Sequence, residues 1–175
     1  MLTFLVGGAR SGKSSLAVEI GLRHYGPVVF VATAEPFDDD LRHRIERHRA
    51  ERPDWPTVEA AIHLAPAIAA ADPTALVIVD CLTVWVGNLF HHLPTAEVRA
   101  LAYDDLVDAL VDRTGPTVVI SNEVGLGLHP ESAMARGYRD ELGLLNQQIA
   151  SAADRSLFLV AGRAMPLHDP WEVLE

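Results

Sequence analysis

The sequence "GGARSGKS", residues 7–14, follows a short apolar run and precedes a segment with the composition of a helix. It fits the pattern G-x-x-x-x-G-K-[ST], in which glycines allow consecutive backbone N–H groups to converge on phosphate oxygens at the start of a helix. In this pattern the lysine reaches the β- and γ-phosphates of a nucleotide, and the serine hydroxyl can bind Mg²⁺. We therefore predict a nucleotide site in which Ser14 binds Mg²⁺ and Lys13 is catalytic. The predicted nucleotide contacts of the loop are Gly7, Gly8, Ala9, Arg10, Ser11, Gly12, Lys13 and Ser14.

An acidic residue from another strand completes this site. The run "ALVIVD", residues 75–80, places Asp80 at the end of an apolar strand, where a phosphate-binding loop usually needs a carboxylate for its metal. An acidic residue at a strand end can also serve only to start a turn. Given the loop at residues 7–14, we predict that Asp80 binds Mg²⁺ and takes part in catalysis.

Short apolar runs alternate with longer helical patterns along the whole chain. The runs lack polar alternation, which is typical of strands that are buried on both faces of a parallel sheet. We predict an α/β fold of the P-loop NTPase type, with a mostly parallel sheet, helices on both faces and a single domain over residues 1–175. The predicted strands are 3–6, 28–32, 75–80, 117–122 and 156–161, and the predicted helices are 13–25, 39–51, 60–71, 82–92, 97–113 and 131–153.

The charge, the cysteine content and the apolar pattern of the chain narrow the class of protein it can be. A formal net charge of −10 over 175 residues argues against a general nucleic-acid binder, which needs a broad basic surface. The single cysteine, Cys81, cannot form an internal disulfide and is predicted to be a small buried apolar residue.

The sequence has no recognisable targeting signal, and its longest apolar region is interrupted by prolines and an aspartate. We therefore expect a cytoplasmic protein with no transmembrane segment.

A local basic stretch, "HRIERHRAERP" at residues 43–53, stands out in this acidic chain. If it is helical, Arg44, His48 and Arg52 lie on one face, with an imidazole between two guanidinium groups. Interleaved glutamates allow a plain alternative, namely a solvated helix face of mixed charge. The functional alternative is that the imidazole attacks a phosphate whose charge the arginines stabilise. The pattern alone leaves both readings open.

Another candidate segment is "SNEVGLGLHPE", residues 121–131. Two glycines and a proline interrupt it, so we expect residues 123–130 to form a mobile loop that could close over a large substrate. A purely structural loop explains the composition equally well. Asn122 and Glu123, at the end of the preceding strand, are candidates for polar contacts.

Four stretches together resemble one family: "GGARSGKS", "VATAEPFDDDLRHRIERHRAERPDWPTVE", "VDCLTVWVGNL" and "ISNEVGLGLHPESAMARGYRDELGLLNQQIASAAD". They are similar to the bifunctional adenosylcobinamide kinase/adenosylcobinamide-phosphate guanylyltransferases of cobalamin biosynthesis, from residue 4 to about residue 163. The resemblance implies a RecA-like P-loop fold. It also implies that the enzyme phosphorylates a hydroxyl of adenosylcobinamide and then attaches GMP to that phosphate through a guanylylated histidine.

Carried over position by position, the resemblance implies that His48 is the covalent, catalytic histidine, whereas His43 has no counterpart. It implies GTP and ATP as substrates, Mg²⁺ as cofactor, adenosylcobinamide and its phosphate as partners, and a homo-oligomer, specifically a trimer. Outside the phosphate loop, the implied nucleotide contacts are Ala32, Thr33, Ala34, Arg49, Ala50, Glu51, Arg52, Glu59 and Asp80.

Two other functions are compatible with the same phosphate loop. One is a monofunctional small-molecule kinase whose basic helix is inert. The other is a non-enzymatic regulator in which a bound nucleotide orders the loop at residues 123–130 for a partner.

Overall fold

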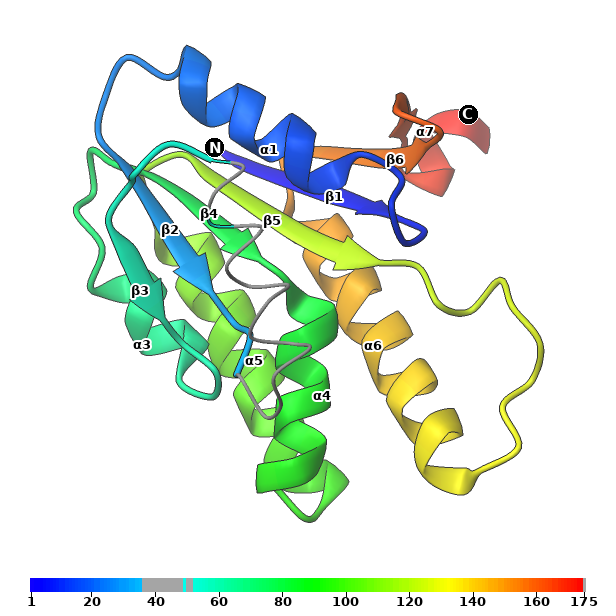
Figure 1. Cartoon of the computed structure of the whole chain (residues 1–175). Helices are drawn as coiled ribbons and strands as arrows, with labels where there is room; N and C mark the ends of the chain where they lie inside the picture. Colours follow the sequence, from blue (N-terminus) through cyan, green and yellow to red (C-terminus); the bar gives the residue numbers. More distant parts are fainter. Residues whose placement is uncertain (36–48, 50–51, 175) are drawn as a thin grey trace.

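The computed structural model describes residues 1–35, 49 and 52–174. Its centre is a seven-stranded sheet in the order β3-β2-β4-β5-β1-β6-β7 (Figure 1). All neighbouring strands are parallel except β6 and β7, which form an antiparallel pair. The α/β fold with a mostly parallel sheet is therefore confirmed. The strands are β1 (Leu2–Gly7), β2 (Val28–Ala32), β3 (Thr57–Glu59), β4 (Leu76–Asp80), β5 (Thr117–Asn122), β6 (Arg155–Val160) and β7 (Arg163–Leu167).

Helices cover both faces of this sheet, as predicted, but unequally. One face carries α1 (Lys13–Arg23), and the opposite face carries the layer of α3 (Leu64–Ala69), α4 (Leu82–His92), α5 (Ala96–Asp112) and α6 (Ala133–Ala152) (Figure 1). A short α7 (Pro170–Leu174) follows β7 at the C-terminal end of the chain. Among the described residues, no helix is both long and apolar enough to cross a membrane.

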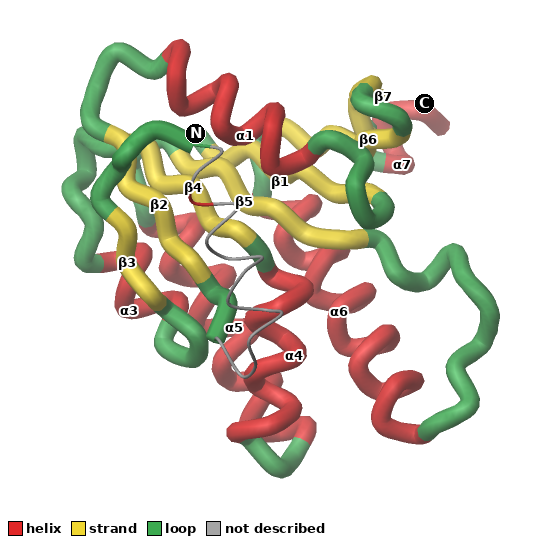
Figure 2. The backbone as a smooth tube through the Cα atoms, viewed as in Figure 1, coloured by secondary structure: helices red, strands yellow, loops and turns green. Residues whose placement is uncertain are grey.

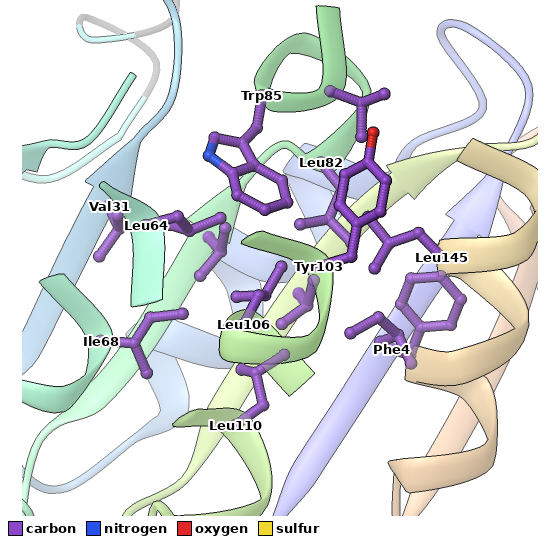
Figure 3. Close-up of a cluster of buried hydrophobic side chains, with 14 of the residues drawn as sticks. Phe4, Val31, Leu64, Ile68, Leu82, Trp85, Tyr103, Leu106, Leu110 and Leu145 are labelled. Carbon is purple, nitrogen blue, oxygen red and sulfur yellow. The ribbon is translucent and has the colours of Figure 1, made fainter. Parts of the chain in front are cut away.

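The central strands are buried on both faces because their side chains supply two separate clusters. The larger cluster lies between the sheet and the four-helix layer, and Figure 3 shows in it Leu82 and Trp85 of α4, Phe4 of β1, and Leu106 and Leu110 of α5. The smaller cluster lies under α1 and is formed by Leu5, Ala17, Val28, Phe30, Leu76, Ile78, Val118, Ile120 and Leu159. Two apolar faces on one strand explain why these runs show no polar alternation.

The edges of the sheet differ from the prediction. The predicted helix at residues 60–71 is shorter at both ends, because α3 covers only residues 64–69, and the edge strand β3 at residues 57–59 was not predicted. Strand β7 and helix α7 were not predicted; β7 is exposed along its whole length and pairs with β6 alone. The predicted helix at residues 39–51 lies outside the described residues, apart from Arg49, which is helical.

Candidate nucleotide-binding site

The candidate site lies at the end of the sheet where the carboxyl ends of the parallel strands β1, β2, β4 and β5 lie side by side (Figure 1). The register pairs Ala32 with Asp80 and Gly7 with Asn122, so the predicted residues of different strands reach the same end. Ligands of open α/β sheets bind at this end, because loops and helix N-termini converge there.

The phosphate loop between β1 and α1 requires glycine at two positions. Gly7 has a φ of 154°, and a Cβ there would lie 2.3 Å from the Leu159 carbonyl oxygen. Gly12 has a φ of 102° and caps α1 without any side-chain hydrogen bond. The backbone N–H groups in the first turn of α1 therefore have no side-chain cap, and an anion can bind them.

The side chain of Lys13 folds back over this loop. Its ammonium donates hydrogen bonds to the carbonyl oxygens of Gly7 (3.0 Å) and Gly8 (2.7 Å) and to Ser11 Oγ (3.3 Å). Burial lowers the pKa of the Lys13 ammonium, while the neighbouring Cys81 and Asp80 act in the opposite direction. All three acceptors are neutral oxygens, so the charged oxygens of a phosphate would be stronger partners for this ammonium.

Asp80 is half-buried at the end of β4, and its backbone is held by Thr33. Thr33 Oγ1 donates to the Cys81 carbonyl (2.8 Å) and accepts from the Cys81 N–H (2.9 Å), and the Thr33 N–H donates to the Asp80 carbonyl (3.2 Å). Thr33 is itself fully buried. The Thr33 hydroxyl therefore holds the backbone of Cys81, the residue directly after Asp80.

Cys81 begins α4 directly after this carboxylate and packs against the smaller cluster. Burial raises the pKa of its thiol to about 11, so the thiol is neutral near pH 7. The expected small buried residue is thus found as a partly buried one that packs against the smaller cluster as a neutral thiol.

The remaining predicted contacts are only partly brought together. Ala32 pairs with Glu59 on one side and with Asp80 on the other, and Ala34 is partly buried two residues further along the chain. Glu59 is exposed at the end of the edge strand β3. His48, Ala50 and Glu51 lie outside the described residues, and so do His43 and Arg44.

Arg52 is fixed beside the smaller cluster by two contacts. Its guanidinium lies 3.8 Å from the centre of the Phe30 ring and donates to Thr57 Oγ1 at 2.8 Å. Burial lowers the pKa of Arg52, and the like charge of Arg49 lowers it further, while Asp80 and Asp54 act in the opposite direction. The charged form of Arg52 is therefore disfavoured by burial and by Arg49, and an anion bound near its guanidinium would stabilise it.

Two residues of the site were missed from the sequence. Asn88 of α4 is buried, and its Nδ2 donates to the carbonyls of Thr33 (2.8 Å) and Ala61 (3.0 Å), which ties the ends of β2 and β3 to α4. The Gly162 N–H, in the turn between β6 and β7, donates to the Ser11 carbonyl at 3.0 Å. A polar residue on the apolar stripe of α4 was the available signal for Asn88, whereas nothing in the sequence marked Gly162.

The end of β5 is attached to the phosphate loop. The Glu123 N–H donates to the Gly7 carbonyl (3.1 Å), and the Asn122 N–H donates to Thr83 Oγ1 (2.8 Å). Asn146 of α6 donates in turn to the Asn122 carbonyl (3.1 Å). Asn122 and Glu123 therefore lie at the site through their backbone.

Comparison with known proteins agrees with this geometry. Residues 3–167 match the family described as cobinamide kinase / cobinamide phosphate guanyltransferase. The chain is 39% identical over 171 residues to the bifunctional adenosylcobalamin biosynthesis protein CobP of Pseudomonas aeruginosa, covering 95% of this chain and 97% of that protein. It is 35% identical over 176 residues to the bifunctional adenosylcobalamin biosynthesis protein CobU of Escherichia coli K12, covering 93% of this chain and 97% of that protein.

Solved structures with low sequence identity share the fold. An ATPase of a bacterial type III secretion system superposes with a TM-score of 0.55 at 14% identity, over 91% of this chain and 51% of that one. The RadB recombinase gives 0.53 at 17% identity, over 90% and 73% of the two chains. The flagellar accessory protein FlaH of Methanocaldococcus jannaschii gives 0.52 at 12% identity, over 95% and 77%. The predicted RecA-like P-loop architecture is thus confirmed.

Proposed function

Since the chain belongs to the cobinamide kinase / cobinamide phosphate guanyltransferase family, and is a bifunctional enzyme of cobalamin biosynthesis, we propose how its residues perform the two reactions. The corrinoid substrate is adenosylcobinamide, and the nucleotide substrates are ATP or GTP for the kinase step and GTP for guanylyl transfer. The observation that carries the proposal is the phosphate loop with its buried Lys13 beside Asp80.

In the kinase step, a hydroxyl of adenosylcobinamide attacks the γ-phosphorus of the nucleotide. A new O–P bond forms, the bond from the γ-phosphorus to the bridging β–γ oxygen breaks, and the hydroxyl proton is released. Lys13 and the N–H groups at the start of α1 bind the β- and γ-phosphate oxygens as charge develops on the leaving nucleoside diphosphate. No residue becomes covalently modified in this step.

Ser14 and Asp80 are the residues we propose to hold Mg²⁺. Their hydroxyl and carboxylate oxygens are the hard ligands that this ion prefers, and Asp80 is close enough to Lys13 to affect its pKa. When bound, Mg²⁺ neutralises part of the charge on the phosphates.

In the guanylyl transfer step, His48 is the nucleophile that we propose from the family resemblance. An imidazole nitrogen attacks the α-phosphorus of GTP, a P–N bond forms, and pyrophosphate leaves. An oxygen of the cobinamide phosphate then attacks the same phosphorus, and the P–N bond breaks. The position of Arg52 supports this role for the basic segment, because its guanidinium is fixed against Phe30 and electrostatically coupled to Arg49 and Asp80.

Incubation with GTP labelled in the α-phosphate tests this route. The wild-type protein should retain label through denaturation, and a P–N bond should lose it in acid and keep it in alkali. His48→Ala should form no adduct and no GDP-cobinamide but still phosphorylate adenosylcobinamide, because the kinase step needs no nucleophilic side chain. His43→Ala is the matched control and should retain both activities. Normal adduct formation by His48→Ala would show that another residue is the nucleophile.

A further inference from the structure

The loop between β5 and α6 is fixed at both of its ends. It contains no helix or strand, as Figure 2 shows, and extends outward from the edge of the sheet before it returns to α6. At its start, the Glu123 N–H is bonded to the Gly7 carbonyl of the phosphate loop. At its end, Arg136 of α6 donates to the carbonyls of Pro130 (3.0 Å) and Glu131 (2.6 Å). The intervening segment is therefore held beside the nucleotide site at one end and beside α6 at the other.

The tip of this loop carries two leucines that pack against almost nothing. Val124 still packs against the larger cluster, but Leu126 is 81% exposed and Leu128 is 97% exposed. They alternate with Gly125 and Gly127, and a Cβ on Gly127 would meet no atom within 4 Å. Packing therefore does not demand glycine at position 127. Its presence leaves the backbone between the two leucines free to adjust to a ligand.

The enzyme's substrate has the chemistry that this arrangement fits. Cobinamide combines a bulky macrocycle, whose conjugated ring and methyl groups are apolar, with an arm that presents a hydroxyl or phosphate for reaction. When the reacting group is at the γ-phosphate, the ring must lie outside the phosphate loop. Leu126 and Leu128 lie four and six residues beyond the end of β5, which are spans of at most about 14 Å and about 22 Å along an extended chain. They can therefore contact the ring while Asn122 remains beside the phosphate loop.

We propose that Leu126 and Leu128 bind apolar parts of the corrin ring, its conjugated ring and methyl groups, in cobinamide and in cobinamide phosphate. The proposal rests on the function described above and assigns corrinoid contacts to the same site. The leucines act in both reactions that involve a corrinoid. They take no part in the guanylylation of the protein by GTP alone, because no corrinoid is bound in that half-reaction.

The test compares the double variant Leu126→Ser/Leu128→Ser with Leu101→Ser, a control that changes a leucine 64% exposed on α5. The double variant should raise the KM for adenosylcobinamide roughly tenfold or more, since apolar contacts of this size give such ratios. Its KM for the nucleotide and its yield of protein-GMP adduct should equal those of the wild type. The control should change none of these quantities.

Three outcomes would overturn the proposal. An unchanged KM for adenosylcobinamide would show that the leucines do not contact the corrinoid. Loss of both adduct formation and kinase activity would show that the loop acts on the phosphate site instead. A changed molecular mass in light scattering, with an unchanged corrinoid KM, would identify a second copy of the chain as the occupant. Absence of an adduct in the wild-type protein would instead contradict the proposed role of His48, and the corrinoid KM would still test the two leucines.

Discussion

The ammonium of Lys13 has three oxygen partners within its own loop, so a nucleotide cannot simply add to this site. Phosphate oxygens must replace the carbonyls of Gly7 and Gly8 as acceptors. The exchange is favourable because hydrogen bonds between charged groups are stronger than those to neutral oxygens. Lys13 therefore contributes both to the resting conformation of the loop and to binding of the triphosphate.

Replacing Lys13 by alanine separates these contributions from those of the glycines, which stay in place. Both the kinase and the guanylylation rate of Lys13→Ala should fall by about 100-fold or more, the usual effect of losing one donor to a developing charge. Initial rates with saturating corrinoid measure the first activity, and labelled adduct measures the second. Ser15→Ala, at an exposed position next in the helix, should remain near wild type. Near-normal turnover by a folded Lys13→Ala protein would refute the role assigned to the loop.

Single residues differ in how far sequence alone could assign them. The position of the phosphate loop between β1 and α1 was predictable because its chemistry demands particular residue types at fixed spacing, and that of Asp80 at the end of β4 because it ends an apolar run. The contacts of Asn88 and Gly162 could not be assigned, since their partners are carbonyl groups of segments far away in the chain. Backbone acceptors are present at every residue and leave no mark in the sequence.

Between elements, a largely buried polar connection joins α5 to α6. Arg99 of α5 donates from Nε to Glu141 of α6 (2.8 Å) and from a terminal nitrogen to the same carboxylate (2.6 Å), and the Tyr103 hydroxyl adds a third bond (2.8 Å). Burial opposes ionisation of Glu141, but the hydrogen bonds from Arg99 and Tyr103 and the charge of Arg99 outweigh it. The pKa of Glu141 is therefore lower than usual.

This connection predicts a pH-dependent stability. Because the folded state lowers the pKa of Glu141, its stabilisation is complete above the ordinary carboxyl pKa of about 4.3 and is lost as the pH falls through the folded-state value. Glu141→Gln should reduce the free energy of unfolding at pH 7 by about 1–3 kcal/mol, with a smaller difference from wild type at pH 3.5. Urea unfolding at both pH values measures this. Glu131→Gln, on the exposed loop before α6, should match wild type at both. A pH-independent difference would contradict the assignment.

The turn between β6 and β7 is the element that supports the phosphate loop from outside. Gly162 has a φ of 72°, and its N–H binds the Ser11 carbonyl. Gly162→Val should strain the turn by about 1–2 kcal/mol and weaken nucleotide binding severalfold through displacement of the phosphate loop. Titration with a non-hydrolysable GTP analogue measures the affinity, and Ala164→Val on the exposed strand β7 is the control. Equal affinities in the two variants would show that the turn and the loop are independent.

For the whole molecule, two apolar clusters share one sheet. Successive residues of β1, β4 and β5 point alternately into the cluster beneath the four-helix layer and into the cluster beneath α1. This double burial made the central strands predictable as continuous apolar runs. The two edge strands were not predictable, because β3 pairs over only three residues and β7 is exposed throughout. Burial of the strand therefore determined which parts of the fold the sequence revealed.

Because the two apolar clusters share the strands of one sheet, we predict that residues 1–175 unfold as one domain. Trp55 packs against the cluster under α1 and Trp85 lies in the larger cluster, so each reports on one face of the sheet. In a Trp171→Phe background, which removes an exposed tryptophan, a variant lacking Trp85 reports through Trp55, and one lacking Trp55 reports through Trp85. In each variant, the fluorescence and far-UV circular dichroism transitions should coincide in urea. The two clusters are built on the same strands, so unfolding of one cluster also disrupts the other. GTP should shift both signals of a given variant together, as expected for a ligand that binds only the folded state. A Trp55 signal that is lost before the helical signal would show that the α1 face unfolds separately, and would overturn the assignment of one cooperative domain.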